Sequence, residues 1–363
     1  MFRNFNTDRF GRTRFEIKDV DVSLVNAIRR LILTDIPVVG FQGEGHSDLS
    51  ILENNGPLHN EIMLHRFGLI PICMDEGETE AFNTDDYDFA LSCTNTNSAM
   101  KNVTSHDITI TKNGKPMKSA DVARIFPASA ITKDHILITR LRTGETLRVE
   151  GKAIKSTARF HAGFSPVSLC TYHFVQDPVE AAKAVGILDK ERKYLQNEYG
   201  DPTLYQFEIE CEAGLSVRYL FDKALEILME KINKVIIESA IATSEYLTIA
   251  PAANDVGYEF TFKGEDDTLG SFIQSYMYSH YIRNPAQNLN SANKPVTYVG
   301  YYCPHPLDHT MVLKICIAPS SPSAPPATES DYIDVVTEQC RRLLVYLQEV
   351  KGEWGRAAPG SVA

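Results

Sequence analysis

The chain has 363 residues, enough for two or three domains at ~150 residues each. The chain has 36 Lys and Arg against 47 Asp and Glu, which gives a formal net charge of −11. This charge argues against a protein that binds nucleic acid without the help of partner subunits. No apolar run approaches the ~18 residues of a membrane span, and the N-terminal residues lack the apolar core of a signal peptide. We therefore expect an intracellular protein with no membrane segment.

The first strong element along the chain is a helix at residues 21–34. Asp21 is a suitable N-cap for it, and Pro37 lies just beyond its end. Short strands are expected on either side, at residues 13–18 and 38–42. The apolar positions of the helix recur at the spacing of one helical face: Leu24, Val25, Ile28, Leu31 and Ile32. The adjacent Arg29 and Arg30 could bind phosphate, or one of them could pair with an acidic group within the chain or on a partner.

Residues 43–203 differ in character, because their segments are short, polar and rich in turns. We expect an inserted, mostly β domain here, with one helix at residues 58–67. Within that helix, Glu61 and His65 lie four residues apart and could supply two metal ligands. The alternative is a polar helix face, with Arg66 beside it, that makes hydrogen bonds or contacts a partner.

A strand and a long helix follow the inserted domain. Residues 204–211 alternate apolar and polar side chains, as a half-buried strand does. Residues 216–239 have the pattern of an amphipathic helix, with an apolar stripe that includes Leu225, Leu228 and Ile232. Residues 248–257 contain Pro251 and small side chains, so we expect them to form a linker.

The C-terminal part repeats the same kinds of element. An alternating strand begins at Tyr258, strands are expected at residues 295–301 and 311–317, and a last helix is expected at residues 331–350. Another helix lies between the first two of these strands. The apolar faces of the two helices are Leu269, Phe272 and Ile273, and Leu343, Leu344 and Leu347.

Two polar groups in the C-terminal part could carry chemistry. Glu265, Asp266 and Asp267 could hold a divalent cation for phosphoryl transfer, but carboxylates at a helix start are better explained as caps. His305 lies between two prolines and could be a catalytic histidine, although a rigid turn between strands explains the prolines without catalysis.

An internal symmetry becomes visible when residues 43–203 are set aside. Both halves then have the order strand, helix, strand, strand, long helix. Each half is an open sheet with two apolar-striped helices, and such a unit cannot bury both of its faces alone. We therefore expect an α+β protein whose two halves pack helices against helices, as a pseudo-twofold pair within one chain.

Motifs in the first half resemble a known family, the alpha-like subunits of DNA-directed RNA polymerases. That family includes the bacterial alpha N-terminal domain, the archaeal D subunit and the third subunit of nuclear RNA polymerase II. Residues 25–33 (VNAIRRLIL), followed by Ile36-Pro37, resemble its signature. So does a set in the inserted domain: Asn55, Leu58, Glu61, His65, Arg66, Gly68, Leu69, Ile70 and Pro71. Residues 161–167 (HAGFSPV) are similar to a further segment in which lysine is usual at the position of Gly163.

The second half resembles the archaeal L subunit and the eleventh subunit of RNA polymerase II. Residues 264–270 (GEDDTLG) are similar to the motif GEDHTLGN, with Asp267 in place of histidine and Ser271 in place of asparagine. Residues 300–309 (GYYCPHPLDH) are similar to GYxxPHPLEH. The residues carrying this L-like motif are Glu265, Asp266, Thr268, Leu269, Gly270, Tyr301, Pro304, His305 and Pro306.

The resemblance implies two alpha-subunit-type dimerisation modules fused in one chain and packed as an intramolecular pseudo-heterodimer. A D-like module would comprise residues 1–42 and 204–247, and an L-like module residues 258–350. The inserted β-rich domain would occupy residues 43–203, the linker residues 248–257, and a C-terminal tail residues 351–363. Fusions of this kind are similar to those of large nucleocytoplasmic DNA viruses.

The role that the resemblance implies is assembly of a polymerase, with catalysis left to the two largest subunits. An interface with the second-largest and largest subunits would include Asn26, Arg29, Arg30, Glu61, His65, Arg66, Pro71, His161 and Pro166. The dimer core would be formed by the apolar stripes: Leu24, Ile28, Leu31, Leu225, Leu228, Ile232, Leu269, Phe272, Ile273, Leu343, Leu344 and Leu347. Small zinc-binding assembly subunits are further implied partners, DNA would be contacted only through the complex, and a homodimer is not expected.

We expect this chain to hold no cofactor, with magnesium in the catalytic large subunits. Some relatives carry a four-cysteine zinc loop or an iron–sulfur site in the inserted domain, but residues 43–203 hold only Cys73, Cys93 and Cys170, far apart. The implied location is the site of transcription, in the host nucleus or, for a virus, the cytoplasmic factory and virion. Two other hypotheses stay open: a stand-alone interaction scaffold, and a metal-dependent enzyme that uses Glu265–Asp267.

Overall fold

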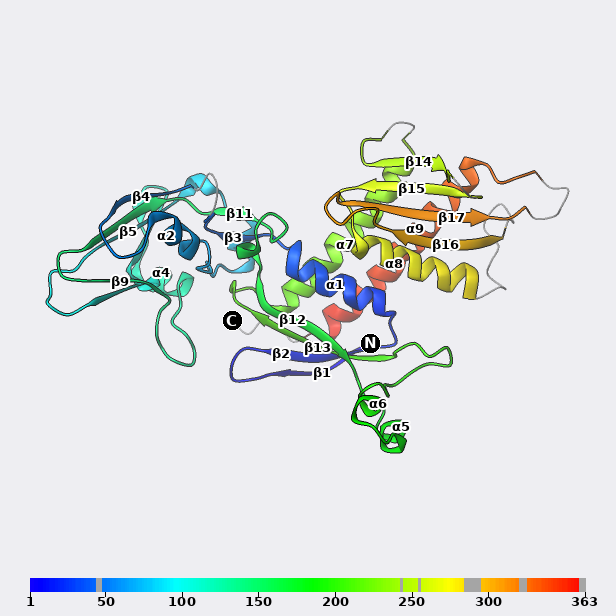
Figure 1. The fold of residues 1–363 in the computed structure, drawn as a ribbon, viewed down its shortest axis with the longest axis horizontal. Coiled ribbons are helices and arrows are strands. Elements are labelled where there is room, and N and C mark those ends of the chain that lie inside the picture. Colours follow the sequence, from blue (N-terminus) through cyan, green and yellow to red (C-terminus); the bar gives the residue numbers. More distant parts are fainter. Residues whose placement is uncertain (44–47, 242–243, 254–255, 284–294, 320–324, 359–363) are drawn as a thin grey trace.

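The computed structural model describes residues 1–43, 48–241, 244–253, 256–283, 295–319 and 325–358. The inserted domain lies at one end of the molecule, a sheet with its helices lies in the middle, and a second sheet with its helices lies at the other end (Figure 1). We call the middle part the first module and the part at the far end the second module. None of the helices in the described residues has the length and apolar content needed to cross a membrane.

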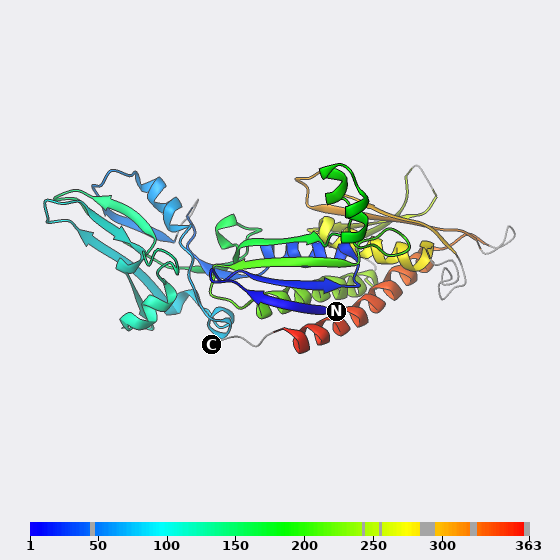
Figure 2. The same ribbon diagram turned by 90° about the horizontal axis from the view of Figure 1, so that it is seen from below.

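The first module is an antiparallel sheet with the strand order β1-β2-β13-β12. Its strands are β1 (Phe2–Thr7), β2 (Thr13–Lys18), β12 (Val167–Phe174) and β13 (Leu204–Cys211). Helices α1 (Val22–Thr34) and α7 (Val217–Ser239) lie on one face of this sheet (Figure 2). Both helices begin where the sequence predicts, because Asp21 and Ser216 accept hydrogen bonds from the backbone N–H groups of Ser23 and Tyr219.

The assignment of β12 corrects the sequence analysis. Residues 167–174 were placed in the inserted domain, but they pair with β13. The strand at residues 38–42 was placed in the first module, but β3 (Val38–Gly40) pairs with β11 (Ile154–Ser156). The error has a physical cause: β12 is an edge strand with several exposed side chains, so its sequence lacks a clean alternation.

The second module is an antiparallel sheet with the order β14-β15-β17-β16. Its elements are β14 (Leu247–Pro251), β15 (Tyr258–Lys263), α8 (Asp267–Met277), the π-helix η4 (Tyr278–Arg283), β16 (Val296–Tyr302), β17 (Thr310–Ile317) and α9 (Glu329–Ala357). The predicted linker at residues 248–257 is therefore wrong over residues 248–251, which belong to β14, the edge strand of this sheet. Pro251 misleads in the sequence, yet an edge strand tolerates a proline because one side of its backbone needs no partner.

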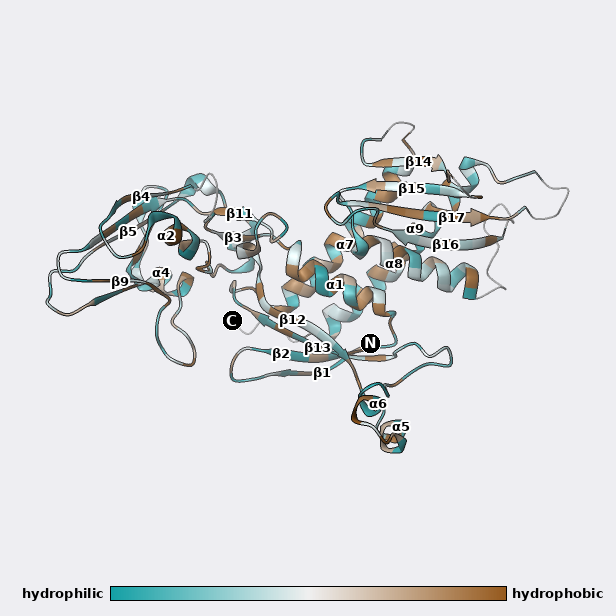
Figure 3. Ribbon diagram, in the orientation of Figure 1, coloured by the Kyte–Doolittle hydropathy of each residue, from teal (hydrophilic) through white to brown (hydrophobic). Residues whose placement is uncertain are grey.

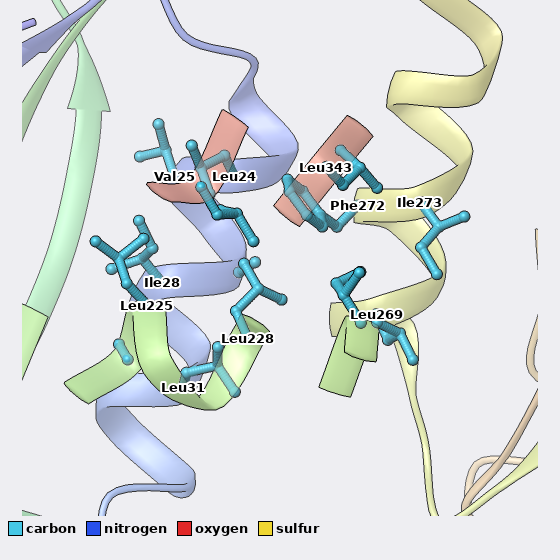
Figure 4. Close-up of a cluster of buried hydrophobic side chains, with 14 of the residues drawn as sticks. Leu24, Val25, Ile28, Leu31, Leu225, Leu228, Leu269, Phe272, Ile273 and Leu343 are labelled. Atoms are coloured by element: carbon cyan, nitrogen blue, oxygen red, sulfur yellow. The ribbon is translucent and has the colours of Figure 1, made fainter. Parts of the chain in front are cut away.

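The helices of the two modules share one apolar core. Helix α1 packs against α8, and α7 packs against α9. In Figure 4 the labelled side chains of α1, α7, α8 and α9 point toward one another. Of the twelve side chains in the expected dimer core, all are buried in this one cluster except Leu344, which is partly buried at its margin. Helices α1 and α8 show the banded hydropathy of amphipathic helices (Figure 3).

Helix α9 continues beyond the predicted end at residue 350 and reaches into the first module. It runs on to Ala357, so the expected tail is largely helical, and residues 359–363 lie outside the described residues. Figure 2 shows its end beneath β1, near the N-terminus. Trp354 is 1% exposed and stacks on Phe221 with ring centroids 4.1 Å apart. Its Nε1 donates to the carbonyl of Arg218 at 3.1 Å, and the Arg218 guanidinium donates to two carbonyls at the helix end.

The inserted domain has its own apolar core, which runs from Val39 to Ala153. Its main sheet has the order β4-β10-β5-β7-β8, and β6 pairs separately with β9. The strands are β4 (Leu49–Asn54), β5 (Tyr87–Thr94), β6 (Lys101–Thr104), β7 (Ile108–Lys112), β8 (Lys115–Pro116), β9 (Leu137–Leu141) and β10 (Thr146–Gly151), and the helices are α2 (Asn60–Phe67), α3 (Glu76–Glu80) and α4 (Ser119–Ile125). Asn113 and Gly114 form the β7–β8 turn with φ of 51° and 71°.

Two short helices form an excursion from the first sheet. Between β12 and β13 the chain forms α5 (Pro178–Lys183) and α6 (Ile187–Glu191), which project from the body of the molecule (Figure 1). The excursion is tied to the second module, because Arg283 of η4 forms an ion pair with Asp201. The two modules are therefore held together at this excursion as well as through their shared core.

We predict that Trp354→Ala lowers the free energy of unfolding by about 3–5 kcal/mol, because it opens a cavity in the first module. Val345→Ala is the matched control on the same helix, since Val345 is 57% exposed, and it should change stability by less than about 0.5 kcal/mol. Urea unfolding followed by circular dichroism measures both. Equal effects of the two substitutions would contradict the packing described for the helix end.

A second prediction concerns the oligomeric state. The apolar helix faces of both modules are covered within the chain, so the described residues leave no comparable face for a second copy. Light scattering should therefore give the mass of one chain, 40.6 kDa. A stable particle of twice that mass would show that the described pairing leaves a dimer face open.

Candidate functional site

A cluster of charged side chains lies where the two modules meet, at the margin of the shared core. Its members, which we call the inter-module ionic cluster, are Arg30, Asp35, Arg159 and Lys231 from the first half and Glu265 and Asp266 from the second half. Three cations face three anions, and both carboxylates of the second half form ion pairs with cations of the first half. The cluster therefore joins the modules by charge as well as by apolar contact.

Asp266 occupies the start of α8, as expected of a helix cap. Its Oδ1 accepts from the backbone N–H of Thr268 at 2.8 Å. Its Oδ2 lies 3.0 Å from Arg159 and 3.4 Å from Arg30. Arg30 also donates to the hydroxyl of Thr268 at 2.8 Å. The predicted capping role is confirmed, and one of the two alternatives for the arginines, pairing within the chain, holds for Arg30.

Glu265 is 5% exposed and is fully engaged by its neighbours. One carboxylate oxygen lies 3.0 Å from the Nζ of Lys231, and the other accepts from the hydroxyl of Tyr246 at 3.1 Å. Burial and the adjacent carboxylate both raise the pKa of Tyr246, which stays protonated and can keep donating. Lys231 also lies 3.6 Å from Asp35, so it connects the C-terminus of α1 to the second module.

The remaining L-like motif residues shape the second module around α8. A Cβ on Gly270 would lie 2.5 Å from the ring of Tyr301, so only glycine allows the helix to approach β16 this closely. Pro304, His305 and Pro306 lie in the exposed turn between β16 and β17, where His305 Nδ1 accepts from the backbone N–H of Leu307 at 3.2 Å. The structure thus supports the prediction of a rigid turn at His305.

Two of the expected interface residues lie on the half-exposed side of α1. Arg29 donates through Nε and Nη2 to the side-chain oxygen of Asn26, at 3.1 and 2.9 Å. The helix packs against the edge strand β12. Unlike Arg30, whose side chain is bound to the second module, Arg29 is held in place by its own helix and remains partly exposed.

A second group of expected interface residues lies on α2 of the inserted domain. Glu61, His65 and Arg66 are exposed, and so are the apolar Ile62 and Leu69 at 46% and 70%. Arg66 donates to the carbonyls of Ile138 and Leu137 in β9, at 2.7 and 2.6 Å. These two bonds fix the guanidinium against β9 and limit its freedom to reach a partner. Pro71, just beyond the helix, is half-buried.

The turn that carries His161 packs directly against the end of α2. It forms the short helix η3 (Ala162–Phe164), and His161 accepts from the backbone N–H of Gly163 at 3.1 Å. A Cβ on Gly163 would lie 2.6 Å from the carbonyl oxygen of Gly68, which explains why lysine cannot stand here in this chain. Pro166 is buried at the start of β12, so it supports the turn and does not present a surface to a partner.

The sequence analysis missed three members of the ionic cluster: Asp35, Arg159 and Lys231. None belongs to a motif with a recognisable spacing, and their partners lie far away along the chain, so pattern alone gives no signal for them. Arg159 lies only two residues before His161, which is the one hint that the sequence offers. Among the described residues, no three His, Cys, Asp or Glu side chains come together as a group that could hold a metal ion.

The ionic cluster predicts a specific pH dependence of stability. Burial opposes ionisation of Asp266, but the hydrogen bonds from Thr268 and the charges of Arg159 and Arg30 outweigh it and lower its pKa to about 2. Since the pKa in the folded state lies below the value of 3.8 for the unfolded state, the charge of Asp266 stabilises the fold above pH 4. That contribution, about 2 kcal/mol, is lost as the pH falls from about 4 to about 2.

Asp266→Asn tests this, because asparagine keeps the capping oxygen but loses the charge. Urea unfolding should show a stability difference from the unaltered chain that is constant above about pH 4 and shrinks below it. Glu198→Gln, at an exposed glutamate between β12 and β13, is the control and should show no such pH-dependent difference. A difference for Asp266→Asn that does not change with pH would contradict the proposed charge pairing.

Comparison with known proteins identifies the two modules. The family described as the RNA polymerase Rpb3/Rpb11 dimerisation domain matches this chain over residues 14–232, and again over residues 258–353. The mouse DNA-directed RNA polymerases I and III subunit RPAC1 is 28% identical over 193 residues, which cover 47% of this chain and 54% of that protein. Subunit 3 of the RNA polymerases II, IV and V of Arabidopsis thaliana is 26% identical over 196 residues, or 50% of this chain and 59% of the relative.

The rpac1 subunit of Dictyostelium discoideum aligns over a longer stretch, with 24% identity over 277 residues that cover 62% of this chain and 78% of the relative. In the mouse and Arabidopsis relatives the chain spans little more than half of their length. The first match contains α1 and most of α7, and the second contains α8 and most of α9, so the matching regions fall within the paired modules. The chain therefore belongs to the RNA polymerase Rpb3/Rpb11 dimerisation family and carries two of its domains in tandem.

Proposed function

We propose that this chain is a non-catalytic assembly subunit of a multisubunit DNA-directed RNA polymerase. In this role it nucleates the enzyme by binding the second-largest subunit and then helps to dock the largest. The names of the relatives described above, each an RNA polymerase subunit, support the assignment to such a complex. The chain acts in DNA-templated transcription through the complex and touches DNA only indirectly, in keeping with its net charge of −11.

The observation that carries the proposal is the single core shared by the two modules. A dimerisation domain needs a second one to cover its helices, and here the partner is part of the same chain. A covalent connection of this length gives an effective concentration on the order of millimolar, so pairing precedes any encounter with a large subunit. The chain thus enters assembly as a finished platform.

Two surfaces are proposed to contact the large subunits. One is the half-exposed side of α1 with Asn26 and Arg29, and the other is the α2 face with Glu61, His65 and Arg66, next to His161. Arginine suits an interface because its planar guanidinium can form two parallel hydrogen bonds with a carboxylate. The exposed Ile62 and Leu69 add apolar area beside these polar groups.

The alternative of a metal-dependent enzyme has less support. Its candidate acids, Glu265 and Asp266, are bound by cations and donors of the chain, and Asp267 lies 3.5 Å from the Sγ of Cys303. Glu265 and Asp266, whose charges are already neutralised in this way, are poorly placed to bind a divalent ion. We propose that the catalytic magnesium belongs to the large subunits and that small zinc-binding subunits join the same assembly. The site of action would be wherever that polymerase transcribes, in the nucleus or, for a virus, in the cytoplasmic factory and virion.

The direct test is native purification of the tagged chain, with partner stoichiometry measured by mass spectrometry. We expect the two large polymerase subunits at one copy each. Recovery of the chain alone, or with unrelated partners only, would contradict the assembly role and favour the stand-alone scaffold. Measurable turnover by the isolated chain, lost on Glu265→Ala, would favour the enzyme.

Substitution at α1 tests the interface separately from the fold. Arg29→Ala removes a side chain whose hydrogen bonds, within the described part of the chain, go to Asn26 of the same helix, so the chain should stay folded.

 The two hydrogen bonds to Asn26 stay within α1 and do not join the modules. We expect recovery of the second-largest subunit to fall at least about tenfold, the loss typical of an arginine anchor. Arg341→Ala, at an exposed arginine of α9, is the matched control and should leave recovery unchanged. Equal recovery with both variants would remove Arg29 from the interface.

A further inference from the structure

Arg159 holds a central place among the contacts between the parts of the molecule. Its Nε donates to Asp35 Oδ1 at 2.6 Å, and its Nη2 lies 3.0 Å from Asp266 Oδ2. Asp35 caps the C-terminus of α1 in the first module, whereas Asp266 caps the N-terminus of α8 in the second. One guanidinium therefore bridges the two modules. The backbone N–H of Arg159 adds a hydrogen bond to the carbonyl of Thr34 at 3.1 Å.

The turn that carries Arg159 also contacts the inserted domain. Four residues further on, a Cβ on Gly163 would lie 2.6 Å from the Gly68 carbonyl at the end of α2. Phe164 is fully buried, and its ring would lie 3.0 Å from a Cβ on Gly40 in β3. Residues 157–166, which we call the junction turn, thus touch all three parts of the molecule. Contacts this close to backbone atoms leave little room for the turn to shift independently.

We infer that Arg159 is a positioning residue that couples pairing of the modules to the orientation of the junction turn, and through it to the large-subunit surface at α2. The second module would then influence partner binding at His161 and α2 through Asp266, at a distance from that surface. The identity of the partner, a large polymerase subunit, rests on the proposed function. The coupling between Arg159 and the junction turn is a property of this chain alone.

The arrangement is more specific than an ordinary surface ion pair. The Arg159 side chain is 34% exposed, but its partners Asp35 and Asp266 are only 9% and 22% exposed. A planar guanidinium can serve two carboxylates at once in a fixed geometry, which a lysine ammonium on a flexible stem does less well. Apolar contacts between the helices are non-directional, so a partly buried charged bridge is well suited to set how the parts are oriented.

Hydrogen exchange of the isolated full chain tests the coupling without any partner. The reporters are backbone amides bonded within the junction turn, at Phe160, His161, Phe164 and Ser165. We expect Arg159→Gln to speed their exchange by at least about tenfold, because it removes the charged contacts with both Asp35 and Asp266. Asp266→Asn should speed the same amides from the other module. The double variant should add little to either single change, because both remove one bridge.

Arg283→Gln is the matched control, since it breaks another ion pair between the modules, with Asp201, that does not touch the junction turn. It should leave exchange of the turn unchanged. The coupling is overturned if Arg159→Gln leaves the turn amides protected, if Arg283→Gln exposes them equally, or if the two cluster substitutions add fully. Arg159→Lys should restore protection only in part.

Recovery of the tagged second-largest subunit completes the test. We expect Arg159→Gln and Asp266→Asn each to lower recovery several-fold, with Arg283→Gln unchanged. Failure of the unaltered chain to bind that subunit would overturn the proposed function but not the coupling, which hydrogen exchange measures independently. Faster exchange of the turn combined with full recovery of the subunit would show that the junction turn lies outside the binding surface, and would overturn its link to the partner.

Discussion

The structure depends on one constraint: each module has two apolar-striped helices on one face of a sheet and must cover them. In this chain each module covers the other, through α1 against α8 and α7 against α9. Trp354, on helix α9 of the second module, also packs into the aromatic core of the first module, where it stacks on Phe221. Neither module is therefore complete alone, and the folded state of each half includes part of the other. Hydrophobic burial of this extent supplies most of the driving force for pairing.

Burial alone does not decide how the two modules are oriented, because apolar contact has no preferred direction. The inter-module ionic cluster supplies direction, since Asp266 and Glu265 each meet a defined cation of the first half. A buried charge without its partner is costly, so alternative packings that separate these groups are disfavoured. The same carboxylates that suggest an active site in the sequence thus serve here to align the modules. We propose that this alignment extends through Arg159 to the surface used by the large subunits.

Local signals in the sequence predict the elements that have strong periodicity and clear caps, such as α1 with Asp21 and α7 with Ser216. They fail where pairing with a strand far away in the sequence determines the sheet to which a segment belongs. Strand β12 joins the first module although its own pattern is irregular, and β14 forms an edge strand in spite of Pro251. Helix α9 continues past the predicted end at residue 350 to Ala357, because tertiary packing of Trp354 keeps the helix intact. In the candidate site, the family motifs point to Asp266, whereas Arg159 and Lys231 are found only when their distant partners are seen in space.

The central claim is that the two halves form one structural unit because they share a core. It is tested most directly by inserting a protease site between α7 and β14, cleaving the purified chain, and applying it to a sizing column under native conditions. We predict that the two fragments elute together at the volume of the uncut chain and separate only in denaturant. Free separation of the fragments under native conditions, each still folded, would contradict the account.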